Sequence, residues 1–202
     1  MKAGSGGAAR SRVTIRGRRA RQRWRDWRAK VMSERRARGA LRRARGSGRR
    51  VVFTNGCFDL LHVGHVSLLE QAAGLGDLLV VGVNSDRSVR RLKGPGRPIV
   101  PLHERMEMLA GLRAVDIVVP FDEDTPARLI HRLRPEILVK GADYRRKTIV
   151  GRATVEAGGG RVVTLPLQRG RSTSTLIRRA LRAAGQTERE AVGGRARARR
   201  GR

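Results

Sequence analysis

Short apolar runs alternate with longer segments of helical periodicity through the middle of this chain. The runs at Val51–Phe53, Leu78–Val83, Asp116–Val119, Ile137–Val139 and Val162–Leu165 are rich in valine, leucine and isoleucine, as buried strands are. Strands that alternate with helices are typical of a parallel sheet with helices on both faces. The pattern therefore predicts an α/β fold with a parallel sheet of about five strands.

Helices are predicted in the intervals between these runs. Ser33, Ser85 and the Thr125-Pro126 pair stand where a side-chain oxygen or a first-turn proline begins a helix. The predicted helices cover residues 31–46, 62–73, 85–93, 102–112, a segment that begins at 125, 148–157 and 174–184.

Positive charge is concentrated at the two ends of the chain. Residues 1–50 hold 19 basic and 2 acidic side chains, and residues 186–202 hold 6 and 2, so these segments carry +21 of the net charge of +29. We predict basic disordered tails over 1–30 and 186–202, because segments so poor in apolar residues cannot form a core. The folded domain is then expected over 31–185, with the helix at 31–46 as its lead-in, and the tails would attract polyanions without specificity.

Cysteine content and hydropathy bear on the compartment. Cys57 is the single cysteine, which excludes an internal disulfide and a multi-cysteine metal cluster. No apolar run approaches the roughly 18 residues of a transmembrane helix, and the amino end lacks an apolar signal segment. We therefore expect a cytoplasmic protein with no membrane span.

The strongest chemical signal is an HxGH segment, His62 to His65, which follows the first strand and a tight turn. The first-turn N–H groups of a helix lack intrahelical partners and the helix dipole is positive there, so such a junction favours an anion. Residues three apart on a helix share a face, so both histidines can reach one ligand, and Gly64 lets it approach the backbone. We interpret the segment as a phosphate-binding site.

A second polar segment precedes the last predicted helix. Ser172, Thr173, Ser174 and Thr175 follow Arg171 and place hydroxyl and N–H groups at another helix start. In an open parallel sheet, ligands bind at the carboxyl ends of the strands where the strand order reverses. Both segments stand at strand-to-helix junctions, as this rule requires of ligand-binding residues.

These two motifs, together with GVNSDRSVRRLKGPGRP at 82–98 and ILVKGADY at 137–144, resemble the HxGH nucleotidyltransferase (cytidylyltransferase-like) superfamily. In particular, they resemble the adenylyltransferase domain of bacterial enzymes that act on D-glycero-beta-D-manno-heptose 1-phosphate. The resemblance covers roughly residues 30 to 185 and implies a Rossmann-like, three-layer nucleotidyltransferase fold. The chain departs from the family at STST, which stands in place of the usual STT core.

The resemblance also implies roles for individual residues. His62, His65 and Lys93 would be the catalytic residues and would contact the triphosphate, while Asp59 would support the loop. The implied nucleotide-binding residues are Thr54, Asn55, Gly56, Phe58, Gly64, Arg171, Ser172, Thr173, Ser174 and Thr175. The implied substrate-binding residues are Lys140, Asp143 and Tyr144, which would lie near the acceptor, and Arg105, which matches a basic phosphate ligand of the family. No metal ligand is expected among the protein side chains, because Mg²⁺ would be carried by the triphosphate.

The implied reaction transfers AMP from ATP to a sugar 1-phosphate, D-glycero-D-manno-heptose 1-phosphate, and gives ADP-heptose and pyrophosphate for bacterial glycan (lipopolysaccharide) biosynthesis. A phosphate oxygen of the acceptor attacks the α-phosphorus, so the reaction needs no covalent enzyme intermediate. Since 202 residues leave no room for a sugar-kinase domain, we expect a separate heptose kinase to supply the acceptor. Whether the chain forms a homodimer is left open.

Three alternatives remain open at this point. A cytidylyltransferase acting on glycerol 3-phosphate or another alcohol phosphate shares the HxGH segment and would prefer CTP. A fragment of a class I aminoacyl-tRNA synthetase carries a similar motif, but this chain lacks a KMSKS-type loop. An inactive nucleotide fold that binds nucleic acid through its basic tail would bind RNA tightly without transferase activity.

Overall fold

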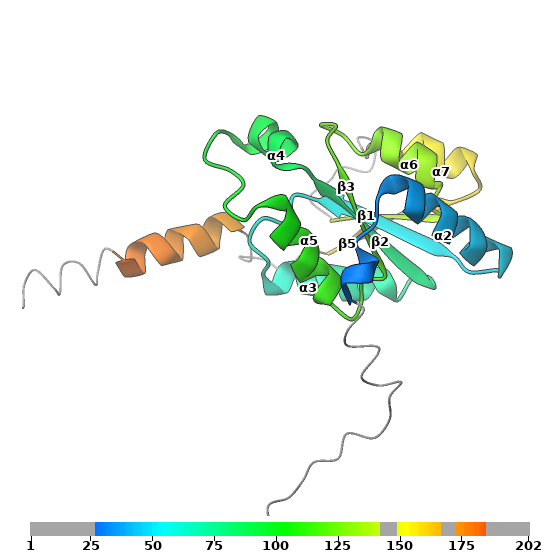
Figure 1. The fold of residues 1–202 in the computed structure, drawn as a ribbon, viewed down its shortest axis with the longest axis horizontal. Helices are drawn as coiled ribbons and strands as arrows, with labels where there is room; N and C mark the ends of the chain where they lie inside the picture. Colours follow the sequence, from blue (N-terminus) through cyan, green and yellow to red (C-terminus); the bar gives the residue numbers. More distant parts are fainter. Residues whose placement is uncertain (1–26, 142–148, 167–172, 185–202) are drawn as a thin grey trace, which may run out of the picture.

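A five-stranded parallel sheet forms the centre of the molecule (Figure 1). The computed structural model describes residues 27–141, 149–166 and 173–184. The strands lie in the order β3-β2-β1-β4-β5, and each neighbouring pair is parallel. They span Val51–Gly56 (β1), Leu78–Asn84 (β2), Ile117–Phe121 (β3), Ile137–Gly141 (β4) and Arg161–Leu165 (β5). The predicted α/β fold and its parallel sheet are confirmed.

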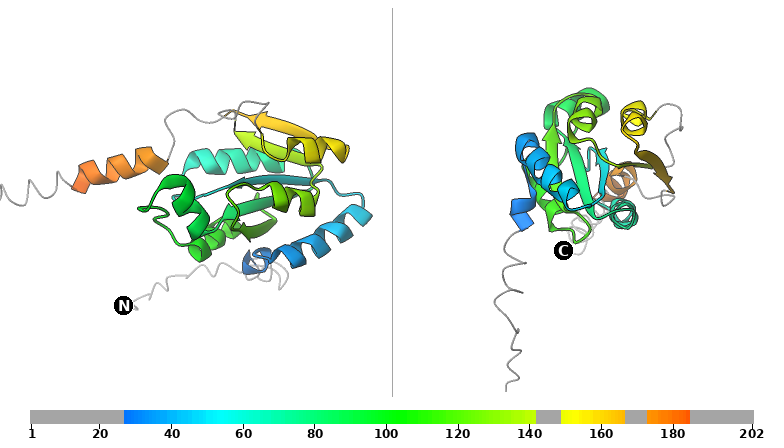
Figure 2. Two further views of the ribbon diagram at one scale, coloured as in Figure 1. Left: turned by 90° about the horizontal axis from the view of Figure 1, so that it is seen from above. Right: turned by 90° about the vertical axis from the view of Figure 1, so that its right-hand side faces the viewer.

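Helices cover both faces of this sheet and produce three layers (Figure 2). One face is covered by α2 (Glu34–Gly46), α6 (Ala127–Leu133) and α7 (Arg152–Ala157), and the other by α3 (Val63–Ala73) and α5 (Leu102–Gly111). The remaining helices are η1 (Trp27–Lys30), α4 (Asp86–Lys93) and a helix over 173–184. Within the described ranges, none of these helices has the length and apolar character needed to cross a membrane.

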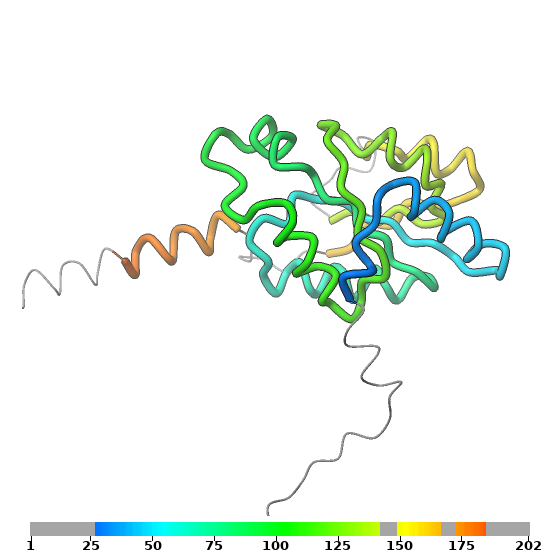
Figure 3. The backbone as a smooth tube through the Cα atoms, in the orientation of Figure 1, coloured from blue at the N-terminus to red at the C-terminus, as the bar shows by residue number. Residues whose placement is uncertain are grey.

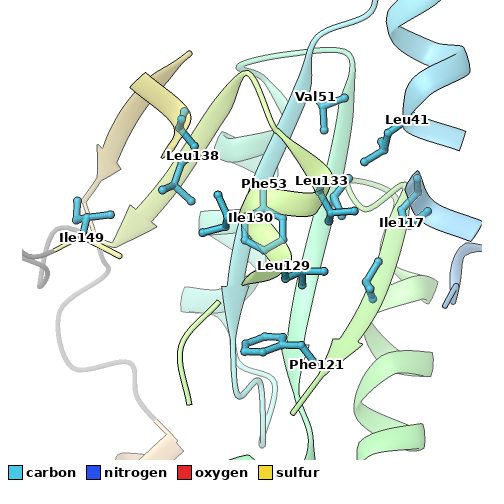
Figure 4. Close-up of a cluster of buried hydrophobic side chains, with 14 residues drawn as sticks. Leu41, Val51, Phe53, Ile117, Phe121, Leu129, Ile130, Leu133, Leu138 and Ile149 are labelled. Atoms are coloured by element: carbon cyan, nitrogen blue, oxygen red, sulfur yellow. The ribbon is translucent and has the colours of Figure 1, made fainter. Parts of the chain in front are cut away.

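The central strand β1 is buried on both faces. Side chains alternate along a strand, so Val51 and Phe53 point into the core under α2 and α6, while Val52 points into the core under α3. Figure 4 shows Phe53 among leucine and isoleucine side chains of α6. On the neighbouring strand, a Cβ atom at Gly82 would lie 2.9 Å from Cζ of Phe53, so only glycine fits beside this ring.

The lead-in to the domain begins earlier than the predicted boundary at residue 31. Ser33 caps α2 as expected, and its hydroxyl accepts a hydrogen bond from the Arg36 N–H at 3.4 Å. Residues 27–30, which we assigned to the basic tail, instead form η1 and contact α5. Trp27 packs against the core, and Lys30 donates to the Leu112 carbonyl at 3.1 Å. The high charge of residues 27–30 led to their assignment to the tail, although the apolar contacts of Trp27 hold this segment against the domain.

The predicted helix over 148–157 begins later, at Arg152. Gly151 precedes it with a φ of 87°, a conformation that ends regular structure for most residues but suits glycine. A Cβ atom there would also lie 2.4 Å from Cδ1 of Ile130. The preceding Ile149 is buried in the core instead of lying on a helix (Figure 4).

Truncation of Leu41 tests whether α2 belongs to the folded domain. Leu41 is fully buried, so Leu41→Ala should lower the free energy of unfolding by about 2–5 kcal/mol through lost contacts and the cavity left behind. The adjacent Arg42 is exposed, and Arg42→Ala should stay within about 0.5 kcal/mol of the parent chain. Urea denaturation measures both values, and equal effects of the two substitutions would contradict a packed lead-in helix.

Candidate active site

A cavity of about 600 Å³ opens at the carboxyl ends of β1, β2 and β4. Its lining includes Asn55 from β1, Asn84 from β2 and Lys140 from β4, and its volume lies within the range of small-molecule sites. β2 lies on one side of β1 and β4 on the other, so this is the point where the strand order reverses. That is the place where open parallel sheets bind their ligands.

The cavity brings together most of the predicted site residues. Those that line it are Asn55, Gly56, Phe58, His62, Gly64, His65, Lys93, Lys140, Thr173 and Ser174. The hydroxyl-rich motif approaches the HxGH segment at the start of the helix over 173–184 (Figure 3), where the Thr173 hydroxyl donates to the Leu60 carbonyl at 3.5 Å. Residues 113 positions apart in the chain therefore meet at one end of the sheet.

The two histidines form a stacked pair at the start of α3. Their ring centroids are 3.8 Å apart with an interplanar angle of 19°, and the Phe58 ring lies 5.1 Å from the His65 ring. His62 caps α3, since its Nδ1 accepts a hydrogen bond from the His65 N–H at 3.3 Å. A neutral imidazole that accepts at Nδ1 carries its proton on Nε2. His62 is thus set to donate from Nε2.

The His65 ring has one polar atom without a partner. Its Nδ1 is buried and makes no hydrogen bond, and it is the one such side-chain atom found in the described residues. Buried polar atoms in native proteins are nearly always satisfied by protein, water or ligand. An orphaned ring nitrogen at the positive end of a helix fits a site that is completed by a bound group.

Both rings are kept neutral by their surroundings. Burial, with a smaller contribution from His62, lowers the pKa of His65 to about 4, and burial also lowers the pKa of His62. Neutral rings beside the α3 dipole offer directed N–H donors to an anion without the repulsion of two adjacent positive charges. Burial likewise raises the pKa of the Cys57 thiol, so this cavity residue stays protonated at neutral pH.

Two cationic side chains have different positions at the cavity. Lys93 stands in the last turn of α4 and lines the cavity. Lys140 is 5% exposed at the end of β4, and its ammonium contacts Oδ1 of Asn55 on the neighbouring strand. The Lys140–Asn55 contact therefore ties β4 to β1 at the cavity edge.

The position of Arg105 corrects the prediction that it binds substrate. Its side chain is fully buried and does not line the cavity. Its guanidinium donates to the Cys57, Val100 and Asn84 carbonyls and to the Asp86 carboxylate. These acceptors belong to two loops, to the end of β2 and to the start of α4, so Arg105 holds together the segments that surround the cavity.

Two predicted nucleotide-binding residues also lie off the cavity. Thr54 is 1% exposed within β1, and Thr175 lies one position beyond the lining residues of its helix. Arg171, Ser172, Asp143 and Tyr144 lie outside the described residues.

Sequence reasoning missed one cation at the cavity. Arg97 lines it and pairs with the buried carboxylate of Asp59. Arg97 directly follows Gly94-Pro95-Gly96 in the 82–98 segment. Its position in a turn between two predicted helices was the one sequence feature that could have indicated a role at the cavity. Its partner is 38 positions away, which no local pattern reveals.

Comparison with known proteins is consistent with this geometry. A family model described as cytidylyltransferase-like matches residues 53–180. The chain is 54% identical over 156 residues to bifunctional protein HldE of Syntrophotalea carbinolica and 57% identical over 148 residues to bifunctional protein HldE of Vibrio atlanticus. These matches cover 77% and 73% of this chain but 32% and 31% of the relatives, so the chain spans about one third of their length.

Among solved structures, a lipopolysaccharide core biosynthesis protein from Thermoplasma volcanium is 28% identical with a TM-score of 0.50. That match covers 60% of this chain and 98% of the other. A pantoate-beta-alanine ligase from Francisella tularensis has a TM-score of 0.51 at 15% identity, which shows a shared fold alone. It covers 69% of this chain and 67% of that protein.

Titration of the His65 ring tests the electrostatics of the site. We expect its pKa at about 4, against 6.5 for an unburied histidine, in an NMR titration of the ring signals. Because the folded-state pKa is depressed, the contribution of His65 to stability is fully present above pH 6.5 and is lost as the pH falls toward 4. Titration of this ring at or above 6.5 would contradict the burial of His65.

Proposed function

We propose that this chain, which belongs to the cytidylyltransferase-like family of nucleotidyltransferases, transfers AMP from ATP to a sugar 1-phosphate and releases pyrophosphate. The observation that carries the proposal is the pair of neutral histidines at the start of α3, which faces a cavity at the reversal point of the sheet. For the acceptor we propose D-glycero-D-manno-heptose 1-phosphate. The motifs of this chain resemble those of heptose 1-phosphate adenylyltransferases, and relatives above 50% identity are named bifunctional protein HldE.

The proposed reaction is a single in-line displacement. A phosphate oxygen of the acceptor forms a bond to the α-phosphorus of ATP, and the bond from that phosphorus to the bridging oxygen breaks, so that pyrophosphate leaves with the electron pair. Negative charge builds up on phosphate oxygens during this step. The protein therefore has to align two anions and stabilise that charge.

The residues of this chain suit that task. His62 would donate its Nε2–H to the triphosphate, His65 would engage it through its ring, and the first-turn N–H groups of α3 would complete the anion site. Lys93, in the last turn of α4, would neutralise phosphate charge in the cavity. Asn55, Gly56, Phe58, Gly64, Thr173 and Ser174 would surround the nucleotide, and Lys140 would lie near the acceptor.

The two histidines alone do not account for the barrier reduction that enzymes achieve. Enzymes lower barriers by about 8–23 kcal/mol, and one preorganised donor supplies roughly 3–4 kcal/mol. Two histidines would then supply about 6–8 kcal/mol. Alignment of two bound reactants can supply a further 7–11 kcal/mol or so, which makes positioning at least as important as the imidazoles.

A divalent cation fits this cavity as part of the nucleotide. The cavity carboxylates are already engaged, since Asp59 accepts from Arg97 and two backbone N–H groups and Asp124 pairs with Arg91 at 2.6 Å. Mg²⁺ would accordingly be held by the triphosphate oxygens, where it neutralises phosphate charge. Because the acceptor carries a phosphate on its anomeric carbon, we propose that a separate sugar kinase supplies it.

The proposal is tested by pyrophosphate release with Mg²⁺, with ATP and CTP each combined with heptose 1-phosphate, other sugar 1-phosphates and glycerol 3-phosphate. We expect release to require ATP and heptose 1-phosphate. His65→Ala should lower turnover at least a hundredfold because it removes a group that meets the triphosphate. His131→Ala, on the exposed surface of α6, serves as the matched control and should retain turnover.

Two results would overturn parts of this proposal. A signal that requires CTP and glycerol 3-phosphate would assign the chain to the cytidylyltransferase branch, which is the branch that gives the matching family model its name. Near-normal turnover in folded His65→Ala would remove the histidine pair from the mechanism.

A further inference from the structure

The loop between α4 and α5 carries a cation whose role the HxGH motif does not explain. We propose that Arg97 binds phosphate oxygens in the cavity and that the buried carboxylate of Asp59 holds its guanidinium in place. This inference rests on the proposed function and adds to it a further cation and a positioning residue. The ligand is a phosphate group, either of the triphosphate or of the phosphorylated acceptor.

The Asp59 side chain holds the loop between α4 and α5 in place. It lies in the loop between β1 and α3, and its side chain is 1% exposed. One carboxylate oxygen, Oδ1, accepts hydrogen bonds from the Ile99 N–H at 2.8 Å and the Val100 N–H at 2.9 Å. The other oxygen, Oδ2, accepts from Nε of Arg97 at 2.5 Å. Three donors from one loop thus fix the loop to the segment that leads into the HxGH helix.

The Arg97 guanidinium is held at one end and available at the other. Its side chain is 20% exposed and lines the cavity. Nε is occupied by Asp59, whereas the two terminal nitrogens make no hydrogen bond to any described residue. Guanidinium groups bind phosphate through paired N–H donors, and a fixed Nε limits the rotations that binding would have to freeze.

Comparison with Arg105 separates a ligand-binding arginine from a structural one. Arg105 is fully buried, and its nitrogens Nε, Nη1 and Nη2 all donate to protein oxygens. Arg97 uses a single nitrogen for the protein and keeps the others at the cavity. A purely structural partner for Asp59 would not need terminal N–H groups there.

The negative charge of the proposed ligands also favours a guanidinium group at the cavity. The two histidines are neutral, and the cations that line the cavity among the described residues are Lys93, Arg97 and Lys140, whose ammonium also contacts Asn55. A triphosphate and a sugar phosphate together bring several negative charges into a space of about 600 Å³. The guanidinium of Arg97 supplies a positive charge that the neutral imidazoles do not.

Direct binding measurements test the inference without depending on turnover. The variants are Arg97→Gln and, as a control of equal charge change, Arg90→Gln, which alters an exposed arginine of α4 outside the cavity. Titration calorimetry gives the affinities for Mg·ATP and for inorganic pyrophosphate, and steady-state kinetics give KM for the acceptor. We expect Arg97→Gln to weaken at least one of these about tenfold or more, and Arg90→Gln to stay within twofold.

The outcomes distinguish the source of the phosphate. Weaker binding of Mg·ATP or pyrophosphate would assign Arg97 to the triphosphate, and a raised acceptor KM with unchanged ATP affinity would assign it to the acceptor. Values within twofold of the parent for all three would overturn the inference. If no acceptor supports turnover, the proposed function fails, while the ATP and pyrophosphate affinities still decide the role of Arg97.

A double-variant cycle tests the positioning role of Asp59. Asp59→Asn keeps an oxygen for the backbone N–H groups but removes the charge that holds Nε. If Asp59 acts through Arg97, the double variant should bind phosphate no more than twofold more weakly than Arg97→Gln alone. Fully additive losses would overturn the positioning role. If Asp59→Asn is too unstable to assay, Arg97→Lys replaces it in the test. This variant keeps the positive charge but lacks Nε, so we expect it to bind phosphate more weakly than the parent chain does.

Discussion

The reversal of strand order at β1 is the constraint on which the site depends. β1 pairs with β2 on one side and with β4 on the other, and all three strands run in the same direction. Their carboxyl ends consequently lie together, while the connections leave toward different faces of the sheet. Residues from distant parts of the chain meet there because the sheet is parallel, and any antiparallel pairing would carry them to opposite ends.

The polar groups around this end of the sheet divide into a fixed frame and a small set of atoms that have no protein partner. Asp59 and Arg105 are buried and engaged by protein atoms, so they hold together the loops after β1 and α4, the end of β2 and the start of α4. The atoms without protein partners in the described ranges include Nδ1 of His65 and the terminal nitrogens of Arg97. A frame that is rigid before the ligand arrives loses little free energy to reorganisation during the reaction. This arrangement supports the proposal that the site binds phosphate anions.

Local patterns predicted the fold and part of the site for physical reasons that individual residues illustrate. Valine-rich runs mark the strands because a strand covered on both faces must be apolar throughout, and Ser33 and Ser85 mark helix starts because their oxygens accept first-turn N–H groups. The HxGH segment could be recognised in the sequence because its two histidines lie within one helical turn. Burial is a property of the assembled fold, however, so the family resemblance misplaced Arg105, and the Asp59–Arg97 pair arises only when two distant loops meet.

The central claim is that the triphosphate of a nucleotide lies at the amino end of α3 against the histidine pair. A crystal structure with Mg²⁺ and the non-transferable analogue α,β-methylene-ATP tests it most directly. We expect phosphate oxygens within hydrogen-bond distance of Nε2 of His62, the His65 ring and the first-turn N–H groups of α3. A nucleotide bound outside the cavity, or bound within it with its phosphates directed away from α3, would contradict the account.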